Sequence, residues 1–456
     1  MTRRISTLGW PAVALAVFAT AWGGNEFTPL LVMYRQSGDM SAVTVDALLF
    51  AYVLGIVPAL LIGGPLSDRL GRRPLMLPAP VFAALGSAIL AAGAGSATML
   101  ASGRVLSGVA LGLSMAVGGS WIKELSDADG APAGTGAKRA AMSLTAGFGI
   151  GAGVAAALAQ WGPWPHVLPY LVNISIAALA AVLLVASPET RARQIRPGRL
   201  LDDLKIPAAG HRRFLLVVLP VAPWVFGAAA SAYAVIPALM STRSSGMPIA
   251  FAGLCCVLGL AAGFLLQSVG RRIDRPGSVR GVVVALVIVA VGMALAALAA
   301  HLLTVWAALL AATVLGCGYG MAMIAGLLEV GRIAGPDDLA GLTAVFYGVT
   351  YLGFAVPAIL AWISETWVSI GYPAMFGFGV VAAVICLAVT LIGHRTGADR
   401  IDPDLAAESA SGPLASLPAP GTCGPLASLP APGTCGPLAS LPAPGRESCE
   451  LDTATR

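Results

Sequence analysis

The sequence predicts an all-α membrane protein with about twelve transmembrane helices in two six-helix, pseudo-symmetric bundles. Three observations lead to this fold class. First, the 456 residues are 57% hydrophobic and only 11% charged, whereas soluble domains carry about 25% charged residues. Second, apolar blocks of about 20 residues, the length that spans a bilayer, alternate with short polar segments. Third, sequence features of the first half recur in the second half at a nearly constant offset.

Twelve apolar blocks have the length and composition of membrane spans. They are rich in Gly and Ala, as expected of helices that pack in lipid through small residues. The first block is too long for a secretory signal, whose apolar region has about 7–15 residues, so we interpret it as an uncleaved span. The expected spans are Trp10–Tyr34, Val45–Gly64, Leu75–Ala94, Met99–Ile122, Ala141–Trp161, Leu168–Ser187, Phe214–Met240, Pro248–Gln267, Gly281–Ala299, Leu303–Leu328, Leu342–Ile363 and Tyr372–Ile392.

Lys and Arg residues are distributed asymmetrically along the chain. All but three of the 27 fall in the terminal segments or in the connections that follow even-numbered spans, the exceptions being Arg35, Arg104 and Arg243. Because cytoplasmic loops are enriched in Lys and Arg, this pattern predicts a multi-pass protein of the plasma membrane with both termini in the cytoplasm. The net charge of +5 is therefore an orientation signal, and no basic stripe with interleaved aromatic residues indicates nucleic-acid binding.

Composition also divides the chain into regions. We expect one six-helix bundle in residues 1–187, a basic cytoplasmic linker at 188–213 and a second bundle in 214–393. Residues 394–456 contain a GPLASLPAPGTC repeat that starts at Gly412. Because Pro, Gly and Ala cannot bury enough apolar area to offset chain entropy, we expect a disordered cytoplasmic tail. We favour an inert expanded repeat over a ligand for a protein partner.

The connection after the second span carries the most specific motif, GPLSDRLGRR, which begins at Gly64. Gly64 is expected to let the helix end pack closely, and Gly71 supplies a turn between two helices. Asp68 can pair with an arginine or cap a neighbouring helix. Arg72 and Arg73 can anchor the connection at an anionic membrane surface. A generic basic loop would explain these arginines but would not explain the complete spacing.

With Arg69, this segment matches every fixed position of the G-x-x-x-D-R-x-G-R-R loop motif, and the chain resembles the major facilitator superfamily. The resemblance implies that Asp68 and Arg72 contact an acidic residue at the end of the fourth span, here Glu124, and hold the cytoplasmic side shut. It also implies two bundles that alternate around a central cavity. The segment Pro188–Thr190 is similar to the Pro-Glu-Ser/Thr sequence that follows the sixth span in this family.

The second half contains a degenerate copy of the motif. It runs from Gly263 to Arg272 and has Gln267 in place of the aspartate, so we expect an asymmetric gate. Glu329 ends the tenth span as Glu124 ends the fourth. The two correspondences support an internal duplication of six spans.

Two glycine-containing motifs resemble sequences of proton-linked family members. Arg104, Gly108 and Gly112 form R-x-x-x-G-x-x-x-G in the fourth span. An arginine there is costly unless it faces water, substrate or a carboxylate, and the alternative is that it snorkels to an interface. In the fifth span, Gly147 and Gly151 resemble the antiporter motif of drug–proton exchangers but lack its usual proline. These four glycines are expected to allow close helix contact.

Glu26 is the clearest carboxylate within any expected span. A carboxylate held away from water can exchange a proton, so Glu26 and Arg104 are candidates for proton coupling. The alternative is a glutamate that is hydrogen-bonded only for packing. Candidates for the cavity wall are Trp22 and Asn25 in the first span and Tyr347 and Tyr351 in the eleventh, although aromatic stripes more often serve packing.

These features favour a secondary transporter of a small, amphipathic organic compound, driven by a proton gradient in the direction of efflux. Proton-symport uptake is the alternative, and a sensor without transport is a third, less favoured class. The chain has no Walker loop, dinucleotide-binding motif or catalytic triad, so we expect neither an enzyme nor an ATP-driven pump. Its cysteines lack metal-binding spacing, and no cofactor, metal or obligate protein partner is expected beyond substrate, protons and lipid.

Overall fold

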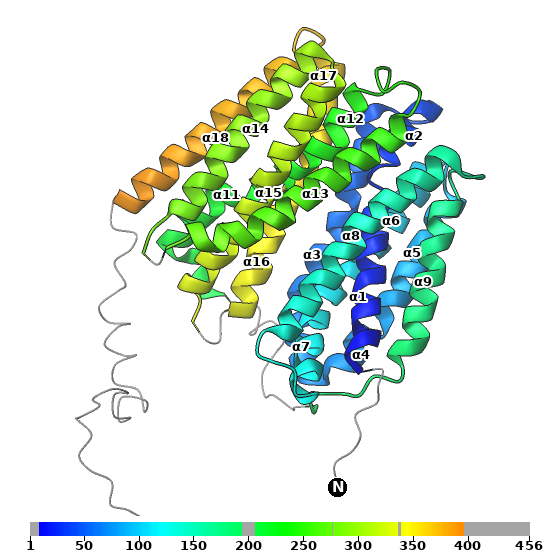
Figure 1. The fold of residues 1–456 in the computed structure, drawn as a ribbon, viewed down its shortest axis with the longest axis vertical. Coiled ribbons are helices and arrows are strands. Elements are labelled where there is room, and N and C mark those ends of the chain that lie inside the picture. The colour runs from blue at the N-terminus through cyan, green and yellow to red at the C-terminus, as the bar shows by residue number, and fades with distance from the viewer. Residues whose placement is uncertain (1–8, 194–205, 276, 336–338, 396–456) are drawn as a thin grey trace, which may run out of the picture. The chain divides into compact units, whose positions relative to one another are not determined.

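A computed structural model describes residues 9–193, 206–275, 277–335 and 339–395. The chain divides into two units, Met1–Asp399 and Arg400–Arg456. Within the described ranges every regular element is a helix (Figure 1). The repeat-containing tail and residues 194–205 of the basic linker lie outside the described residues.

The first half contains helices that match the first six expected spans. They are α1 Gly9–Asn25 and α2 Leu31–Ser37, α3 Ala42–Leu70, α4 Arg72–Met76 with α5 Pro78–Ala92, α6 Ala97–Leu113 with α7 Gly119–Ala128, α8 Thr135–Trp161, and α9 Leu168–Leu184. A π-helical turn, Ser114–Gly118, connects α6 to α7 without breaking the span.

The second half repeats this arrangement. Its helices are α11 Leu219–Ala230, preceded by the π-helical turn Phe214–Val218 and continued through Ser231–Val235 into α12 Ile236–Leu239; α13 Pro248–Ile273; α14 Arg280–Leu302; α15 Val305–Ile333; α16 Leu339–Tyr351, joined by the 3₁₀ turn Leu352–Ala355 to α17 Val356–Thr366; and α18 Tyr372–Arg395. The short 3₁₀ helix Pro207–Gly210 precedes this half.

Ten of these helical segments are long and apolar enough to cross a membrane, and Leu168–Leu184 is a shorter apolar helix. The remaining expected span, the first, is interrupted where a continuous helix was predicted. Helix α1 ends at Asn25, and a hydrogen-bonded turn precedes α2. Pro29 has no backbone N–H, so it cannot bond the carbonyl of Asn25 as a continuous helix requires. Thr28 donates to that carbonyl instead, at 3.2 Å.

Glycine allows two equivalent helix pairs to pack with their backbones in contact. In the first half α3 crosses α6, and a Cβ atom on Gly108 would lie 2.1 Å from the carbonyl oxygen of Tyr52. In the second half α13 crosses α15, and a Cβ atom on Gly320 would lie 2.0 Å from the carbonyl oxygen of Gly263. These pairs are spans two and four and spans eight and ten, so the packing repeats with the predicted internal symmetry.

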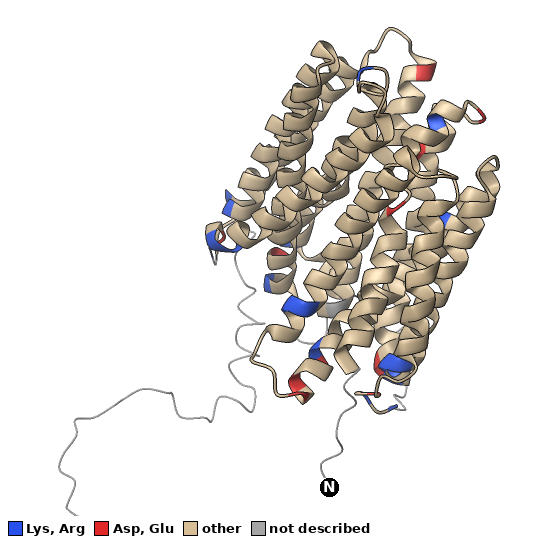
Figure 2. Cartoon of the chain, turned by 45° about the vertical axis from the view of Figure 1, so that its right-hand side comes forward, with Lys and Arg blue, Asp and Glu red and all other residues tan. Residues whose placement is uncertain are grey.

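The charged residues define the two ends of the helical unit. We call the end that carries Arg72, Arg139, Arg213, Arg271 and Arg332 the basic end. Figure 2 shows most Lys and Arg residues of the described chain there. The other end, where α3 and α13 begin, is called the opposite end.

The two halves share a hydrophobic core toward the opposite end only. That core contains Phe27 and Leu49 from the first half and Tyr233, Ile249 and Phe354 from the second. Helix α8 packs against α13, and α3 packs against α16 and α17. At the basic end each half has a separate core.

The separate core of the first half includes Val17, Met76 and Trp121. Its counterpart in the second half includes Val217 and Phe346. The structure is therefore a conformation whose apolar contact between the halves lies toward the opposite end.

Candidate functional site

The motif connection between α3 and α4 is built around Gly71. This residue has φ +101° and ψ 168°, a region that is essentially restricted to glycine. A Cβ atom on Gly71 would also lie 2.7 Å from the Oε2 atom of Glu189. Glycine is thus required here both by the backbone conformation and by the approach of a side chain from a distant part of the sequence.

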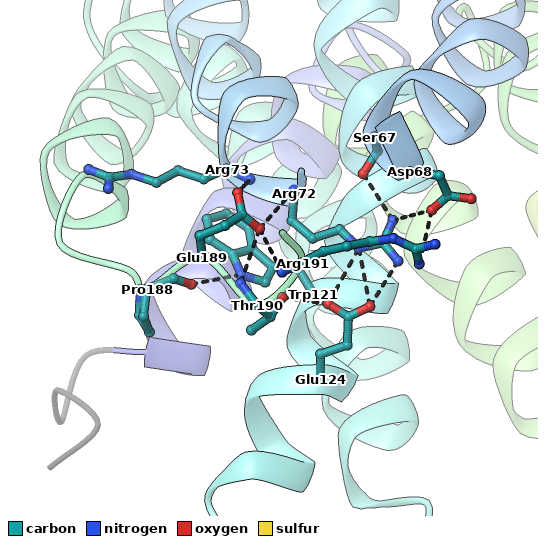
Figure 3. Close-up of polar contacts among 10 residues, drawn as sticks. All are labelled: Ser67, Asp68, Arg72, Arg73, Trp121, Glu124, Pro188, Glu189, Thr190 and Arg191. Carbon is teal, nitrogen blue, oxygen red and sulfur yellow. Dashed lines mark hydrogen bonds and ion pairs between the residues drawn. The ribbon is translucent and has the colours of Figure 1, made fainter. Parts of the chain in front are cut away.

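Arg72 stands at the centre of a polar network (Figure 3). Its Nη2 atom donates to the Oε1 atom of Glu124 at 2.8 Å, and its Nη1 atom donates to Asp68 at 3.0 Å and to Ser67 at 2.9 Å. Asp68 also forms an ion pair of 3.2 Å with Arg191. The structure thus brings together Asp68, Arg72 and Glu124, which sequence reasoning proposed as partners. The side chain of Arg72 is only 7% exposed, so this pairing occurs in a partly dehydrated site.

The segment that follows the sixth span completes this network. The carboxylate of Glu189 accepts hydrogen bonds from the backbone N–H groups of Arg72 (2.9 Å) and Arg73 (2.8 Å) at the start of α4. A carboxylate at a helix N-terminus is stabilised by the unpaired N–H groups and the helix dipole. Thr190 donates to Glu124, and Trp121 donates to the carbonyl of Pro188 at 3.1 Å.

The residues expected to begin a cytoplasmic linker therefore pack against the first bundle. The Pro-Glu-Thr sequence was the available signal for this role, but it did not identify the partners. Among the other motif residues, Arg73 donates to the carbonyl of Val185 at 2.6 Å, and Arg69 is half-buried on α3. Gly64 does not serve the expected purpose in this conformation, because no atom lies within 4 Å of a Cβ atom built on it.

The second half carries a different network at the equivalent place. The Nε atom of Arg213 donates to Glu329 at 2.7 Å, and Arg332 forms ion pairs with both Glu329 and Asp274. Glu329 therefore corresponds to Glu124 in this network. The two arginines that pair with Glu329 lie next to the seventh and tenth spans, outside the degenerate motif. Arg213, Arg332 and Asp274 were not singled out from the sequence, because no motif marks them.

A cavity lies between the two halves, with a free volume of about 30 Å³, whereas one buried water molecule requires about 10–15 Å³. Its wall includes Asn25 and Tyr351. Trp22 and Tyr347 are not among the residues that line this space, and Trp22 packs against Gly151. The wall is formed by Gly24, Asn25, Thr28, Leu49, Tyr52, Arg104, Phe148, Phe226, Tyr233, Leu260, Tyr319, Tyr351 and Phe354.

Arg104 reaches the cavity from α6 and is 1% exposed. It does not snorkel to an interface. Its Nη1 atom donates to the carbonyl of Gly24 at 3.0 Å, and its guanidinium carbon lies 5.0 Å from the ring centre of Phe27 and 4.5 Å from that of Tyr52. Two aromatic faces and a backbone carbonyl thus stabilise a buried cation.

Glu26 lies in the interior of the first bundle and does not line the cavity. It is fully buried, and Ser87 of α5 donates to its Oε1 atom at 2.8 Å. Asn173 of α9 donates to Ser87, also at 2.8 Å. Arg104 donates to the carbonyl of Gly24, two residues before Glu26. No direct ion pair joins Arg104 and Glu26 within the described chain.

The four glycines predicted for packing all face neighbouring helices. A Cβ atom on Gly112 would lie 2.6 Å from the carbonyl oxygen of Ile56, and one on Gly147 would lie 2.4 Å from that of Phe18. A Cβ atom on Gly151 would lie 2.9 Å from Trp22, and Gly108 contacts α3 as described above. In the described part of the chain, no group of three or more His, Cys, Asp or Glu residues is arranged to hold a metal ion.

Comparisons with known proteins agree with this architecture. The family model of the Major Facilitator Superfamily matches residues 13–358. A chloramphenicol resistance protein of Pseudomonas aeruginosa is 24% identical over 393 residues, which cover 81% of this chain and 86% of the relative.

Solved transporter structures share the fold at low sequence identity. The nucleoside transporter NupG has a TM-score of 0.66 and 14% identity, with 87% of this chain and 100% of that one covered. A D-xylose–proton symporter has a TM-score of 0.60 and 17% identity, with 83% and 96% covered. This chain is a multi-pass membrane protein with a transporter fold, and it belongs to the major facilitator superfamily of secondary transporters.

Proposed function

We propose that this transporter exports a small organic compound from the cell in exchange for protons. The observation that carries the proposal is the position of Arg104, which lines the cavity and is bonded to the α1 backbone two residues before the buried Glu26. One side chain thus contacts both the substrate space and the segment that holds the candidate proton carrier. The similarity to a chloramphenicol resistance protein supports export.

The coupling follows from the cost of burying charge. A fully buried carboxylate without a paired cation is costly, by several kcal/mol per ion, so Glu26 is suited to hold a proton while Arg104 is engaged with the carbonyl of Gly24. Substrate in the cavity competes for Arg104 and changes its position relative to α1. A shift of the guanidinium toward Glu26 would favour the carboxylate and release the proton. Substrate and proton would then occupy separate sites connected through Arg104.

The membrane orientation is part of this proposal. The basic end is assigned to the cytoplasm because Lys and Arg are enriched in cytoplasmic connections, and the membrane is assigned as the plasma membrane. In the structure the halves share an apolar core only toward the opposite end. This conformation would therefore be the one that receives substrate from the cytoplasm. The network around Arg72 would stabilise the first bundle at the gate.

Liposome flux tests the function and its direction. Purified protein is reconstituted, a pH gradient of either sign is imposed, and the accumulation of radiolabelled chloramphenicol is measured. Exchange with protons predicts saturable accumulation when the interior is acidic. Accumulation only with an acidic exterior would instead show proton-symport uptake. Absence of saturable flux under both gradients would contradict transport of this compound.

The variant Glu26→Gln tests the coupling site. We expect it to lose accumulation driven by the proton gradient while it keeps substrate exchange without a gradient, because an amide cannot release a proton. The control is Glu365→Gln, since Glu365 is an exposed carboxylate on α17 at the opposite end. If Glu26→Gln still builds a substrate gradient from a proton gradient, Glu26 has only a structural role.

A further inference from the structure

The wall of the central cavity combines stacked aromatic rings with a single cation. We propose that it selects flat aromatic compounds that are neutral or negatively charged, and that it rejects organic cations of the same shape. This inference rests on the proposed function in so far as the cavity is the site that substrate occupies during transport.

The aromatic rings of the cavity wall already stack on one another. Phe226 of α11 lies parallel to Tyr351 of α16, with ring centres 4.5 Å apart and an angle of 18° between the planes. Its centre is also 4.6 Å from that of Phe354, at 20°. Tyr52 of α3 meets the rings of Tyr351 and Phe354 edge-on, at 6.3 Å and 6.4 Å.

This stack shows which ligand shape the wall accommodates. Parallel faces and an edge-on ring are the arrangements that aromatic pairs prefer. With about 30 Å³ free, a substrate must displace a side chain to enter. A planar ring that replaces Phe226 would regain the same stacking against Tyr351 and Phe354, whereas a saturated group of equal size would lose it. Phe226 therefore occupies the position against Tyr351 and Phe354 that the ring of an aromatic ligand would take.

The charge of the cavity comes from one residue. Arg104 is the only charged side chain among the wall residues of the described chain. It donates to the carbonyls of Gly24 and Leu48 and lies over the rings of Phe27 and Tyr52, all of which are uncharged. Glu26 does not reach the cavity wall. A ligand in this space meets a net positive charge in surroundings of low dielectric constant, where a charge acts strongly.

Two consequences follow for ligand recognition. A carboxylate, nitro or carbonyl oxygen can accept a hydrogen bond from a guanidinium group, which has five donors in a planar arrangement. An ammonium group is repelled by the same cation. In addition, the guanidinium carbon of Arg104 lies over the ring of Tyr52, 4.5 Å from the ring centre. This face of the Tyr52 ring is therefore not available for a cation–π interaction with an organic cation.

Three probes of similar size with one aromatic ring and different charges separate shape from charge: 4-nitrobenzyl alcohol, 4-nitrobenzoate and 4-nitrobenzylammonium. Their binding to the purified full-length protein in lipid nanodiscs is measured by equilibrium dialysis. We expect the neutral and anionic probes to bind at least about tenfold more tightly than the cation. Equal or tighter binding of the cation, or no saturable binding of the alcohol and the benzoate, would overturn the inference.

Two variants locate the selectivity in the cavity. Phe354→Leu should weaken all aromatic binding about tenfold because the ligand loses one of the rings on which it stacks. Its matched control is Phe378→Leu, since Phe378 is 66% exposed on α18 and lies outside the cavity. Arg104→Gln should abolish the preference for benzoate over the ammonium probe, and Arg104→Lys should keep part of it. Unchanged binding in Phe354→Leu, or an unchanged charge preference in Arg104→Gln, would contradict the assignment.

The binding series needs no variant to fold, because the wild-type protein alone distinguishes the three charges. It is also independent of transport. Binding with the expected order but without flux would support the recognition site and contradict the transport of these compounds. Flux of chloramphenicol together with tight binding of the ammonium probe would support transport and overturn the recognition inference.

Discussion

Replacing Gly71 by alanine is the sharpest test of the motif connection. The backbone conformation of Gly71 costs a residue with a Cβ atom about 1–3 kcal/mol. The new Cβ atom would also lie 2.7 Å from Glu189 and displace its carboxylate. Because Glu189 is exposed, the loss of one of its backbone hydrogen bonds is taken at the ordinary net value, about 0.5–1.5 kcal/mol. Gly71→Ala should therefore destabilise the protein by about 1.5–4.5 kcal/mol.

The comparison variant is Gly130→Ala. Gly130 has φ +75°, and no atom lies within 4 Å of the position that the new methyl group would take, so it should lose only about 1–2 kcal/mol through backbone strain. Both are measured by reversible denaturation in the same detergent. In a double-mutant cycle, Gly71→Ala should cost less stability in a Glu189→Ala background, where only the backbone strain at residue 71 remains. Equal destabilisation by Gly71→Ala and Gly130→Ala, or additivity with Glu189→Ala, would refute the contact with Glu189.

Three further predictions concern orientation, gating and packing. In a cysteine-free background, Asp39→Cys should react with an impermeant maleimide added to intact cells, whereas Pro207→Cys should not, because the basic end faces the cytoplasm. Asp68→Asn should lower liposome flux while leaving the protein folded, since its amide can no longer form an ion pair with Arg72 or Arg191. Gly108→Ala should lower the free energy of unfolding by about 1–3 kcal/mol, because a methyl group cannot fit at 2.1 Å from the α3 backbone.

Each of these predictions has a control and a contrary outcome. Labelling of Pro207→Cys in sealed cells would reverse the orientation. Gln267→Ala, at the degenerate motif, should affect flux far less than Asp68→Asn, and normal flux in Asp68→Asn would remove the gating role. Gly149→Ala is the control for Gly108, because no atom lies within 4 Å of the added methyl group. It should be neutral or stabilising, and an equal loss in both variants would contradict the packing argument.

The general fold could be predicted from the sequence because the membrane restricts spanning segments to long apolar helices. Each expected span falls on helix in the structure. The ends were placed less accurately: α3 runs to Leu70 and α7 to Ala128, several residues beyond the predicted limits. Polar residues extend these helices past the apolar block, and hydropathy does not register that extension. The first span was expected as one segment, Trp10–Tyr34, whereas the structure divides it into α1 and α2 around Pro29.

Residues of the candidate site could be predicted only where they belong to a recognisable sequence motif. Asp68 and Arg72 are four residues apart, and the motif resemblance linked them to Glu124. Glu189 lies 117 residues from Arg72, and such a pairing depends on how the sixth span returns to the third. Which face of a helix borders the cavity is equally a property of packing between halves. For this reason the sequence alone could not decide whether Trp22 and Tyr347 border this space.

The glycine contacts between paired helices limit how the protein can move. Where the backbones of α3 and α6 touch, neither helix can slide past the other by a residue without bringing a Cβ atom into a carbonyl group. The same holds for α13 and α15. We therefore expect each helix pair to move as a rigid body during the transport cycle. The contacts that change during the cycle should be those between the two halves, where α8 meets α13 and α3 meets α16. Cross-links between the halves at these contacts should arrest the cycle, whereas cross-links within a helix pair should not.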